Sequence, residues 1–357
     1  MLADLPIFGV FGSHESGKTT LIEKLLPRLL GQGLSVAVAK IHGSRIEVDR
    51  PGKDSDRFYQ AGADVWMHGR DEGFGRSHVR PDDPVAARLC RLARRHDLVL
   101  VEGRRPFGCA KVWLLGEGET EPPADAGPLV ACWPRDADRL EATWNILQAW
   151  LPLQWRRTPV YACILIGGRS TRMGRPKHLI RRGGVSWIER TAAALAGLAE
   201  RIAVVGAGNV PRALSGITRL ADAPDAEGPL AGILAAMRWA PWASWLVVAC
   251  DLPNLSREAL EWLLSTRAPG VWAALPRLPG RGGVEPLLAH YDFRARAILE
   301  EPAAEGKFAP SLLAGRAKVL APAPPAGLAA AWENVNTPAD LARAGSGSRR
   351  PSPRRAW

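Results

Sequence analysis

The chain has 357 residues, of which 46% are hydrophobic, and this length suits two or three globular domains rather than one. No apolar run is long enough to span a bilayer, and no cationic segment precedes the first apolar run, so we expect neither a membrane-spanning helix nor a secretory signal. The net charge of +11 favours anionic partners, and nucleoside triphosphates fit better than nucleic acid because aromatic and basic residues do not alternate.

The five cysteines indicate a reducing compartment. They are scattered, odd in number and form no Cys-x-x-Cys pair, which argues against a disulfide framework and against a structural zinc site. We therefore expect a cytoplasmic protein.

A phosphate-binding loop follows the first predicted strand. The apolar run 7–11 leads into residues 12–20, which fit the pattern G-x-x-x-x-G-K-[ST] without a mismatch. Leucines on one face of residues 21–30 predict the helix that this motif requires. We expect loop amides to surround a β-phosphate, the lysine to reach the β- and γ-phosphates, and the first threonine to ligate Mg²⁺. The expected nucleotide-binding residues are Gly12, Ser16, Gly17, Lys18, Thr19 and Thr20.

The remainder of the first half predicts a mainly parallel sheet. Residues 34–40 form a second predicted strand, and residues 98–103 form a buried strand that ends in Glu102, a carboxylate able to hold Mg²⁺ through water. Repeated strand–helix units of this kind give parallel sheets with right-handed crossovers.

The boundary between two domains is predicted after a helix at 140–151. Residues 152–159 contain two prolines and break the apolar periodicity. The domains that we expect are a phosphate-loop domain at 1–153, a second α/β domain at 154–344, and a disordered basic tail at 345–357.

A second glycine-rich loop follows the predicted strand 160–164. A glycine pair after a buried strand lets the backbone approach a ligand, and the cations behind it suit a polyphosphate. The alternative is a glycine turn with a solvated basic loop. We assign Lys177 to the triphosphate and Arg172 as its helper. The loop residues expected to bind nucleotide are Leu165, Ile166, Gly167 and Gly168.

Two aspartates complete the predicted second site. Asp251 follows the buried strand 245–250, a fixed position that suits a Mg²⁺ ligand; a turn aspartate before Pro253 is the alternative. Displacement at the α-phosphorus of a nucleotide needs no protein nucleophile, only positioning and neutralisation of charge. The expected catalytic residues are therefore Lys177, Arg172 and Asp251. On its own, Asp222 could equally be a solvated loop acid.

The second half resembles the MobA-type molybdenum cofactor guanylyltransferases. The resemblance rests on four segments in the family's order, which are Leu165–Lys177, Gly228–Gly232, Cys250–Pro253 and Asn334–Pro338. It implies a Rossmann-like nucleotidyltransferase fold and transfer of GMP from GTP to Mo-molybdopterin. It also implies that Asp222 accepts hydrogen bonds from guanine.

The first half, from about residue 6 to 151, resembles MobB, a GTP-binding adaptor with a P-loop NTPase fold. The resemblance rests on the phosphate loop, on the segment Asp49–Ser55 with Ala61–Ala63 after it, and on the strand end Val101–Gly103. The phosphate loop alone indicates only a superfamily, and the loop at 50–55 narrows the resemblance to this family. The resemblances together imply two three-layer α/β domains fused in one chain.

The implied ligands are GTP, Mg²⁺ and Mo-molybdopterin as acceptor. Implied partners are cofactor-insertion proteins and molybdoenzyme clients, with no nucleic acid and no membrane. One alternative is a cytidylyltransferase on the same pterin, although such enzymes usually have Ala-Gly where Gly167-Gly168 stands. Another is an adaptor whose second half only holds pterin. Ile166 replaces a small residue of the family and predicts a side chain that can crowd the base.

Overall fold

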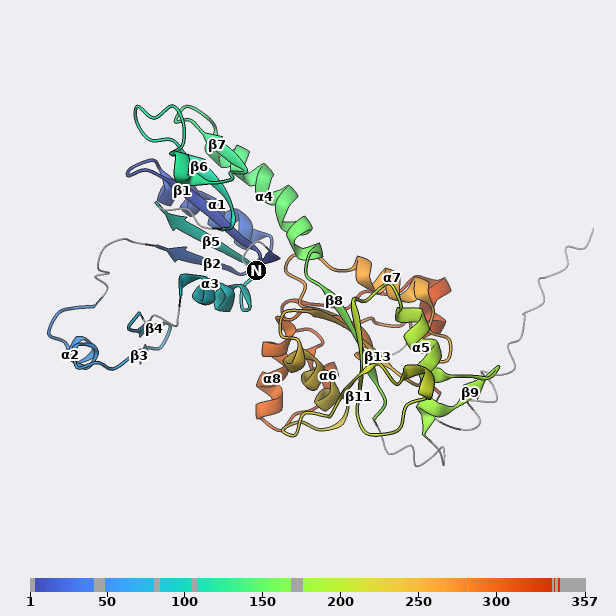
Figure 1. Cartoon of the computed structure of the whole chain (residues 1–357). Coiled ribbons are helices and arrows are strands. Elements are labelled where there is room, and N and C mark those ends of the chain that lie inside the picture. Colours follow the sequence, from blue (N-terminus) through green and yellow to red (C-terminus); the bar gives the residue numbers. More distant parts are fainter. Residues whose placement is uncertain are drawn as a thin grey trace, which may run out of the picture. The chain divides into compact units, whose positions relative to one another are not determined.

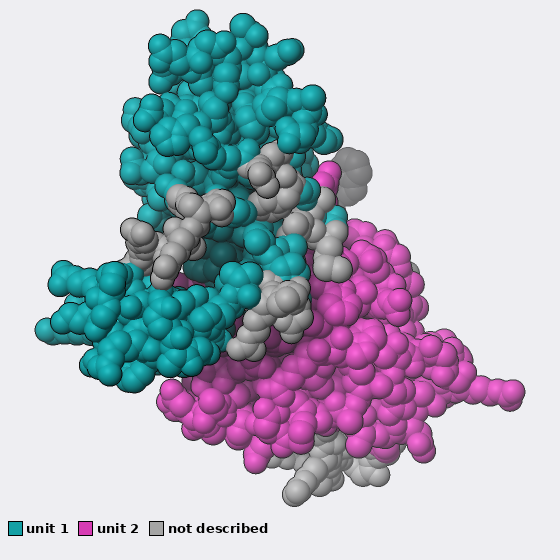
Figure 2. Space-filling model, turned by 60° about the vertical axis from the view of Figure 1, so that its left-hand side comes forward, with its two compact units in different colours: residues 1–154 teal, residues 155–357 magenta. Residues whose placement is uncertain are grey.

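The chain forms two compact α/β units, residues Met1–Gln154 and Trp155–Trp357 (Figure 2). The structure is a computed structural model. The residues that it describes are 4–41, 49–79, 84–104, 108–167, 176–280, 282–335, 337 and 340.

The first unit is built on a five-stranded parallel sheet of order β2-β5-β1-β6-β7 (Figure 1). A separate antiparallel pair, β3 and β4, follows the short helix α2. The elements are β1 (Ile7–Gly12), α1 (Lys18–Gly31), β2 (Val36–Lys40), α2 (Asp54–Gln60), β3 (Val65–His68), β4 (Gly73–Arg76), α3 (Val85–Ala93), β5 (Leu98–Gly103), β6 (Ala110–Leu114), η2 (Ala124–Ala126), β7 (Ala131–Trp133) and α4 (Arg139–Arg156).

Both faces of this sheet are covered by helices. Strand β1 is buried along its whole length, as expected for a parallel strand between two helical layers. Its Ile7 and Phe11 share a core cluster with Leu89 of α3. On the opposite face, Phe8 meets Trp150 of α4 edge-on, with ring centroids 5.2 Å apart. The predicted three-layer arrangement is confirmed.

Helix α4 continues beyond the end that the sequence predicts. The proline at 152 was expected to end the helix near residue 151, but the helix contains it and ends at Arg156. Proline removes one backbone donor and strains the preceding turn. The last two residues of the helix belong to the second unit, where the Trp155 side chain is buried and the Arg267 guanidinium donates to the carbonyl oxygens of Trp155 and Thr158 at 3.1 and 2.8 Å. A cation bound to the last carbonyls is a favourable helix end.

The second unit contains a seven-stranded mixed sheet of order β12-β11-β8-β13-β15-β14-β16 (Figure 1). The elements are β8 (Val160–Leu165), η3 (Lys177–Leu179), β9 (Arg181–Arg182), β10 (Val185–Ser186), α5 (Trp187–Leu195), β11 (Arg201–Val205), η4 (Arg212–Leu214), β12 (Thr218–Leu220), α6 (Gly228–Trp239), β13 (Ser244–Ala249), α7 (Arg257–Ser265), β14 (Ala273–Ala274), β15 (Leu288–Tyr291), α8 (Ala295–Ala304), η5 (Pro310–Leu313), β16 (Val319–Leu320) and η6 (Ala326–Trp332).

Alternate residues of β8 face different helical layers. Ile164 belongs to a core cluster with Ile188 of α5 and Leu260 of α7. The ring of Tyr161, which points the other way, lies near Trp239 of α6, with centroids 5.9 Å apart. The sheet therefore lies between two helical layers, as the sequence predicts.

The strand order creates a switch point between β8 and β13. The chain leaves β8 for β11 and β12 on one side and then returns to β13 on the other. In open α/β sheets, ligands bind at the carboxyl ends of the strands where the order reverses in this way. None of the helices within the described ranges has the length and apolar character needed to cross a membrane.

Candidate active site

Three strands of the second unit end at the same edge of the sheet. In the β8–β11 ladder Leu165 pairs with Val205, and in the β8–β13 ladder it pairs with Ala249. The segments that follow these strands therefore begin side by side. They include the second glycine loop and Asp251.

Lys177 and Asp251 meet at the switch point. The Lys177 ammonium lies 2.9 Å from the Asp251 carboxylate, although 74 residues separate them in the chain. Each side chain is 18% exposed, so the pair is half-buried but open to a ligand. The structure thus brings together the predicted triphosphate-binding cation and the predicted Mg²⁺ ligand.

The last of the four segments that resemble the MobA-type family contacts the backbone of Asp251. The backbone N–H of Val335 donates to the Asp251 carbonyl oxygen at 3.1 Å. The buried Val335 side chain packs with Ile180 and Trp187, which follow Lys177 in the chain. This segment therefore links the backbone after β13 to the backbone after β8.

Helix α6 approaches β8 closely through a glycine. A Cβ added to Gly232 would lie 2.6 Å from Leu165 Cδ2 and 3.4 Å from Asp222 Oδ1, so no larger residue fits there without movement. Desolvation raises the pKa of Asp222. Asp222 lies at the end of β12, near the start of the nucleotide loop, but its contact with a base is a prediction.

Ile166 does not project toward a base, and that expectation was wrong. Its side chain is 4% exposed and belongs to the main core cluster of this unit, because its backbone extends the pleat of β8 and pairs with Val205. Leu165 is also buried. These two residues can therefore offer a ligand only their backbone groups. Two further residues of the predicted site, Gly168 and Arg172, lie outside the described residues.

In the first unit, the predicted phosphate-binding loop follows the end of β1. Gly17 has φ +87°, a conformation that favours glycine, and a Cβ on Gly12 would lie 2.4 Å from the Leu114 carbonyl oxygen. The Lys18 ammonium donates to the Ser13 carbonyl oxygen and lies 3.3 Å from Ser16 Oγ. Burial lowers the pKa of Lys18, which the Glu102 carboxylate opposes. Thr20 is exposed on the first turn of α1.

Glu102 connects the phosphate loop to strand β2. Its Oε1 accepts a hydrogen bond from the Thr19 hydroxyl at 3.0 Å and lies 3.3 Å from the Lys40 ammonium. Since the Thr19 hydroxyl donates to the carboxylate, its lone pairs remain available to a cation. Lys40 was not among the predicted site residues. Its only sequence signal was its position at the end of a predicted strand.

Comparison with known protein families gives a match for each half of the chain. Residues 162–319 match the family described as MobA-like NTP transferase domain, and residues 7–131 match molybdopterin guanine dinucleotide synthesis protein B, or MobB. A molybdopterin-guanine dinucleotide biosynthesis adapter protein of Haemophilus influenzae is 35% identical over 123 residues, which cover 33% of this chain and 67% of that protein. A "probable molybdenum cofactor guanylyltransferase" of Pelotomaculum thermopropionicum is 32% identical over 195 residues, covering 51% and 89%.

The chain belongs to both families: it joins a MobB domain to a MobA-like NTP transferase domain. A molybdenum cofactor biosynthesis bifunctional protein of Synechocystis sp. is 29% identical over 137 residues, covering 38% of this chain and 40% of that protein. Among solved structures, molybdopterin-guanine dinucleotide biosynthesis protein A of Archaeoglobus fulgidus is 26% identical with a TM-score of 0.44, covering 52% of this chain and 96% of that chain.

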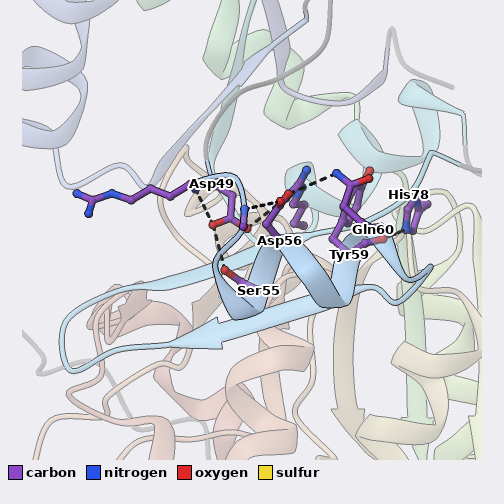
Figure 3. A network of polar contacts seen from close by, with 9 residues as sticks. Asp49, Ser55, Asp56, Tyr59, Gln60 and His78 are labelled. Atoms are coloured by element: carbon purple, nitrogen blue, oxygen red, sulfur yellow. Dashed lines mark hydrogen bonds and ion pairs between the residues drawn. The ribbon is translucent and has the colours of Figure 1, made fainter.

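In the MobB domain, the segment that narrows the family match forms a structural network (Figure 3). Asp49 accepts hydrogen bonds from Ser55 Oγ at 3.0 Å and from Arg76 at 3.2 Å, and Asp56 accepts from Arg76 at 2.9 Å. The Gly52 N–H donor and the Arg76 guanidinium lower the pKa of Asp56. The Arg76 guanidinium also lies 3.8 Å from the centre of the Tyr59 ring. Through Asp49 of the segment and Asp56 just after it, these contacts fasten the start of α2 to β4.

Arg139, a further residue that contacts the phosphate loop, was not among the predicted site residues. Arg139, at the start of α4, donates to the carbonyl oxygens of Ser16 at 2.6 Å, Pro134 at 2.7 Å and Leu115 at 2.7 Å. It also donates to Trp133 at 3.1 Å. Arg139 therefore fixes the phosphate loop to the ends of β6 and β7.

Proposed function

We propose that the MobA-like domain transfers GMP from GTP to molybdenum-bound molybdopterin, giving the guanine dinucleotide cofactor. A phosphate oxygen of the pterin attacks the α-phosphorus of GTP, the bond to the β-phosphate oxygen breaks, and pyrophosphate leaves. The chain's membership of this transferase family supports the reaction type. The observation that carries the assignment to this edge of the sheet is the contact between Lys177 and Asp251 at the switch point.

The residues at this edge of the sheet have different roles in the proposed reaction, according to their chemistry. The Lys177 ammonium neutralises charge on the triphosphate, with Arg172 as its helper. The backbone of Leu165, Ile166, Gly167 and Gly168 lines the nucleotide. Asp222 accepts from the guanine edge, and its raised pKa reflects the desolvation that would strengthen such hydrogen bonds.

Mg²⁺ is the expected metal ion in both domains. Within the described ranges no cluster of three or more His, Cys, Asp or Glu side chains is placed to hold a metal by itself. Mg²⁺ commonly takes one or two protein oxygens and completes its shell with phosphate oxygens and water. Asp251 would hold it in the MobA-like domain, and Thr19, with Glu102 through water, in the MobB domain. When bound, it would withdraw charge from the phosphate oxygens.

The MobB domain binds GTP through Gly12, Ser16, Gly17, Lys18, Thr19 and Thr20 and assists delivery of the finished cofactor. The partners in that step are cofactor-insertion proteins and molybdoenzyme clients. All five cysteines are free thiols, which suits a reducing cytoplasm.

The test is incubation of the full chain with GTP, Mg²⁺ and molybdopterin-loaded carrier, followed by the mass of the product. The expected product carries one added GMP, and one pyrophosphate is released for each. Preferential turnover of CTP in a competition would replace the guanylyl assignment by a cytidylyl one. Binding of pterin without any pyrophosphate release would leave only an adaptor.

The first prediction separates the two nucleotide sites. Lys177→Met and Asp251→Asn keep the side-chain size but remove one charge each, and we expect each to lower pyrophosphate release at least about 100-fold. Lys18→Ala, in the other domain, should leave most of that rate. If Lys18→Ala alone abolished the rate, the assignment of the reaction to the MobA-like domain would be wrong.

A further inference from the structure

A buried histidine joins two segments of the candidate active site. His178 directly follows Lys177 in η3 and is 3% exposed. Its Nε2 lies 2.9 Å from the carbonyl oxygen of Asn209, which is 31 residues away in the chain. Asn209 belongs to residues 206–209, the turn that ends β11, which we call the β11 turn.

The β11 turn is held on three sides. A Cβ on Gly206 would lie 3.0 Å from the backbone nitrogen of Gly167, so this glycine packs directly on the nucleotide loop. Arg219 of β12 donates to the Gly208 carbonyl oxygen at 2.7 Å. A Cβ on Gly208 would lie 3.1 Å from Cε1 of His178, so the imidazole ring fills the space on the third side.

The link is a neutral hydrogen bond. Burial lowers the pKa of His178, the hydrogen bond to Asn209 opposes this, and the positive charge of Arg219 adds to it. A carbonyl oxygen can only accept, so Nε2 carries the hydrogen. The contact therefore holds at neutral pH without a charge on the ring.

We propose that His178 is a positioning residue that fixes the distance between the β11 turn and the Lys177 ammonium. This inference rests on the proposed function, in which the nucleotide lies on the backbone that begins at Leu165, against which the β11 turn packs, and its triphosphate reaches the Lys177 ammonium. A site whose two ends are pre-set loses less freedom when the nucleotide binds, so the affinity for the nucleotide is higher. In this role the buried His178 acts through the two segments that it joins and not by contact with the nucleotide.

The test compares variants of the full chain. His178→Leu keeps the buried volume but removes the donor, and we expect the KM for GTP to rise about 3- to 10-fold, the worth of one hydrogen bond, with kcat within about twofold. His178→Gln, whose amide nitrogen can reach the position of Nε2, should restore a KM within about twofold of the wild type. Arg182→Ala, at an exposed position on the same segment, is the matched control and should change neither constant.

Equilibrium titration with Mg²⁺ and GTP distinguishes the two possible failures. If the wild type releases no pyrophosphate, the proposed reaction is wrong, but His178→Leu must still weaken one of the two GTP sites and His178→Gln must restore it. The positioning role is overturned if His178→Leu keeps wild-type KM and affinity, or if His178→Gln is equally impaired. A lower melting temperature with unchanged affinity also overturns it. If His178→Leu does not fold, His178→Asn, whose amide is too short to reach Asn209, takes its place.

Discussion

At the scale of single residues, Gly206 shows how closely the backbone segments of the transferase site approach. Its φ is +109°, and an added Cβ would meet backbone atoms of Gly167 at 3.0 and 3.2 Å. Backbone atoms cannot rotate away as a flexible side chain can. The second prediction follows from this contact.

Gly206→Ala should lower the stability of the MobA-like domain by about 1–2 kcal/mol, the cost of a left-handed conformation, and should also raise the KM for GTP by displacing the nucleotide loop. Melting temperature and steady-state kinetics together measure both effects. Gly216→Ala is the matched control, because a Cβ there meets nothing within 4 Å. If the two variants had the same melting temperature and the same KM for GTP, the close contact with Gly167 would affect neither stability nor nucleotide binding.

Sequence reasoning found the residues that carry charge after a strand but missed the residues that bind backbone carbonyls. Lys177 and Asp251 each follow an apolar run, and parallel strands bring such positions to one edge, so their proximity could be expected. His178 and Arg139 act on carbonyl oxygens of distant loops. No pattern in the side chains predicts such a contact, because every residue has a carbonyl group. Ile166 was misjudged because the end of a buried strand was taken for the start of a loop.

At the scale of elements, helix α4 supports the phosphate loop through its first residue. The Arg139 guanidinium donates to four backbone carbonyl oxygens, one of them from Ser16. Burial lowers the pKa of Arg139, but an arginine remains protonated in proteins. The planar fork of arginine allows several donors to point in fixed directions, which a lysine cannot reproduce.

The third prediction is that Arg139→Leu destabilises the MobB domain by about 1–3 kcal/mol and weakens GTP binding at the phosphate loop, since four carbonyl groups lose their donor. Arg139→Lys should fall between this variant and the wild type. Asn145→Ala, at an exposed position on the same helix, serves as control. Calorimetry and GTP titration are the measurements. Unchanged GTP affinity in Arg139→Leu would confine this residue to a role in stability.

At the scale of the whole molecule, each unit has its own apolar core and its own sheet, which is parallel in the first unit and mixed in the second. The alternation of strands and helices predicted this α/β class for both halves, and it is confirmed. The end of α4 was not predictable from the proline alone, because Arg267, more than 100 residues further along, donates to the carbonyl oxygen of Trp155 in its last turn. Separate cores suggest that the units unfold in separate thermal transitions.

A fall in pH should destabilise the second unit through a histidine on an interior strand of its sheet. His290 lies on β15 between Leu246 of β13 and Ala274 of β14, and it is 1% exposed. Neither ring nitrogen has a hydrogen-bond partner among the described residues. Burial and the nearby positive charge of Arg267 lower the pKa of His290 well below its usual value.

The fourth prediction follows from the sign of this shift. Above about pH 6.5 the ring is neutral in both states, so it adds no pH dependence. As the pH falls below that value, the unfolded chain binds the proton and the folded chain does not, so stability is lost, by about 1 kcal/mol at pH 5.5. His290→Leu should remove this loss, leaving the smaller one from His178. Calorimetry of the full chain at pH 7.5 and 5.5 measures it, with the MobB transition as internal reference; parallel losses in wild type and variant would contradict the role of His290.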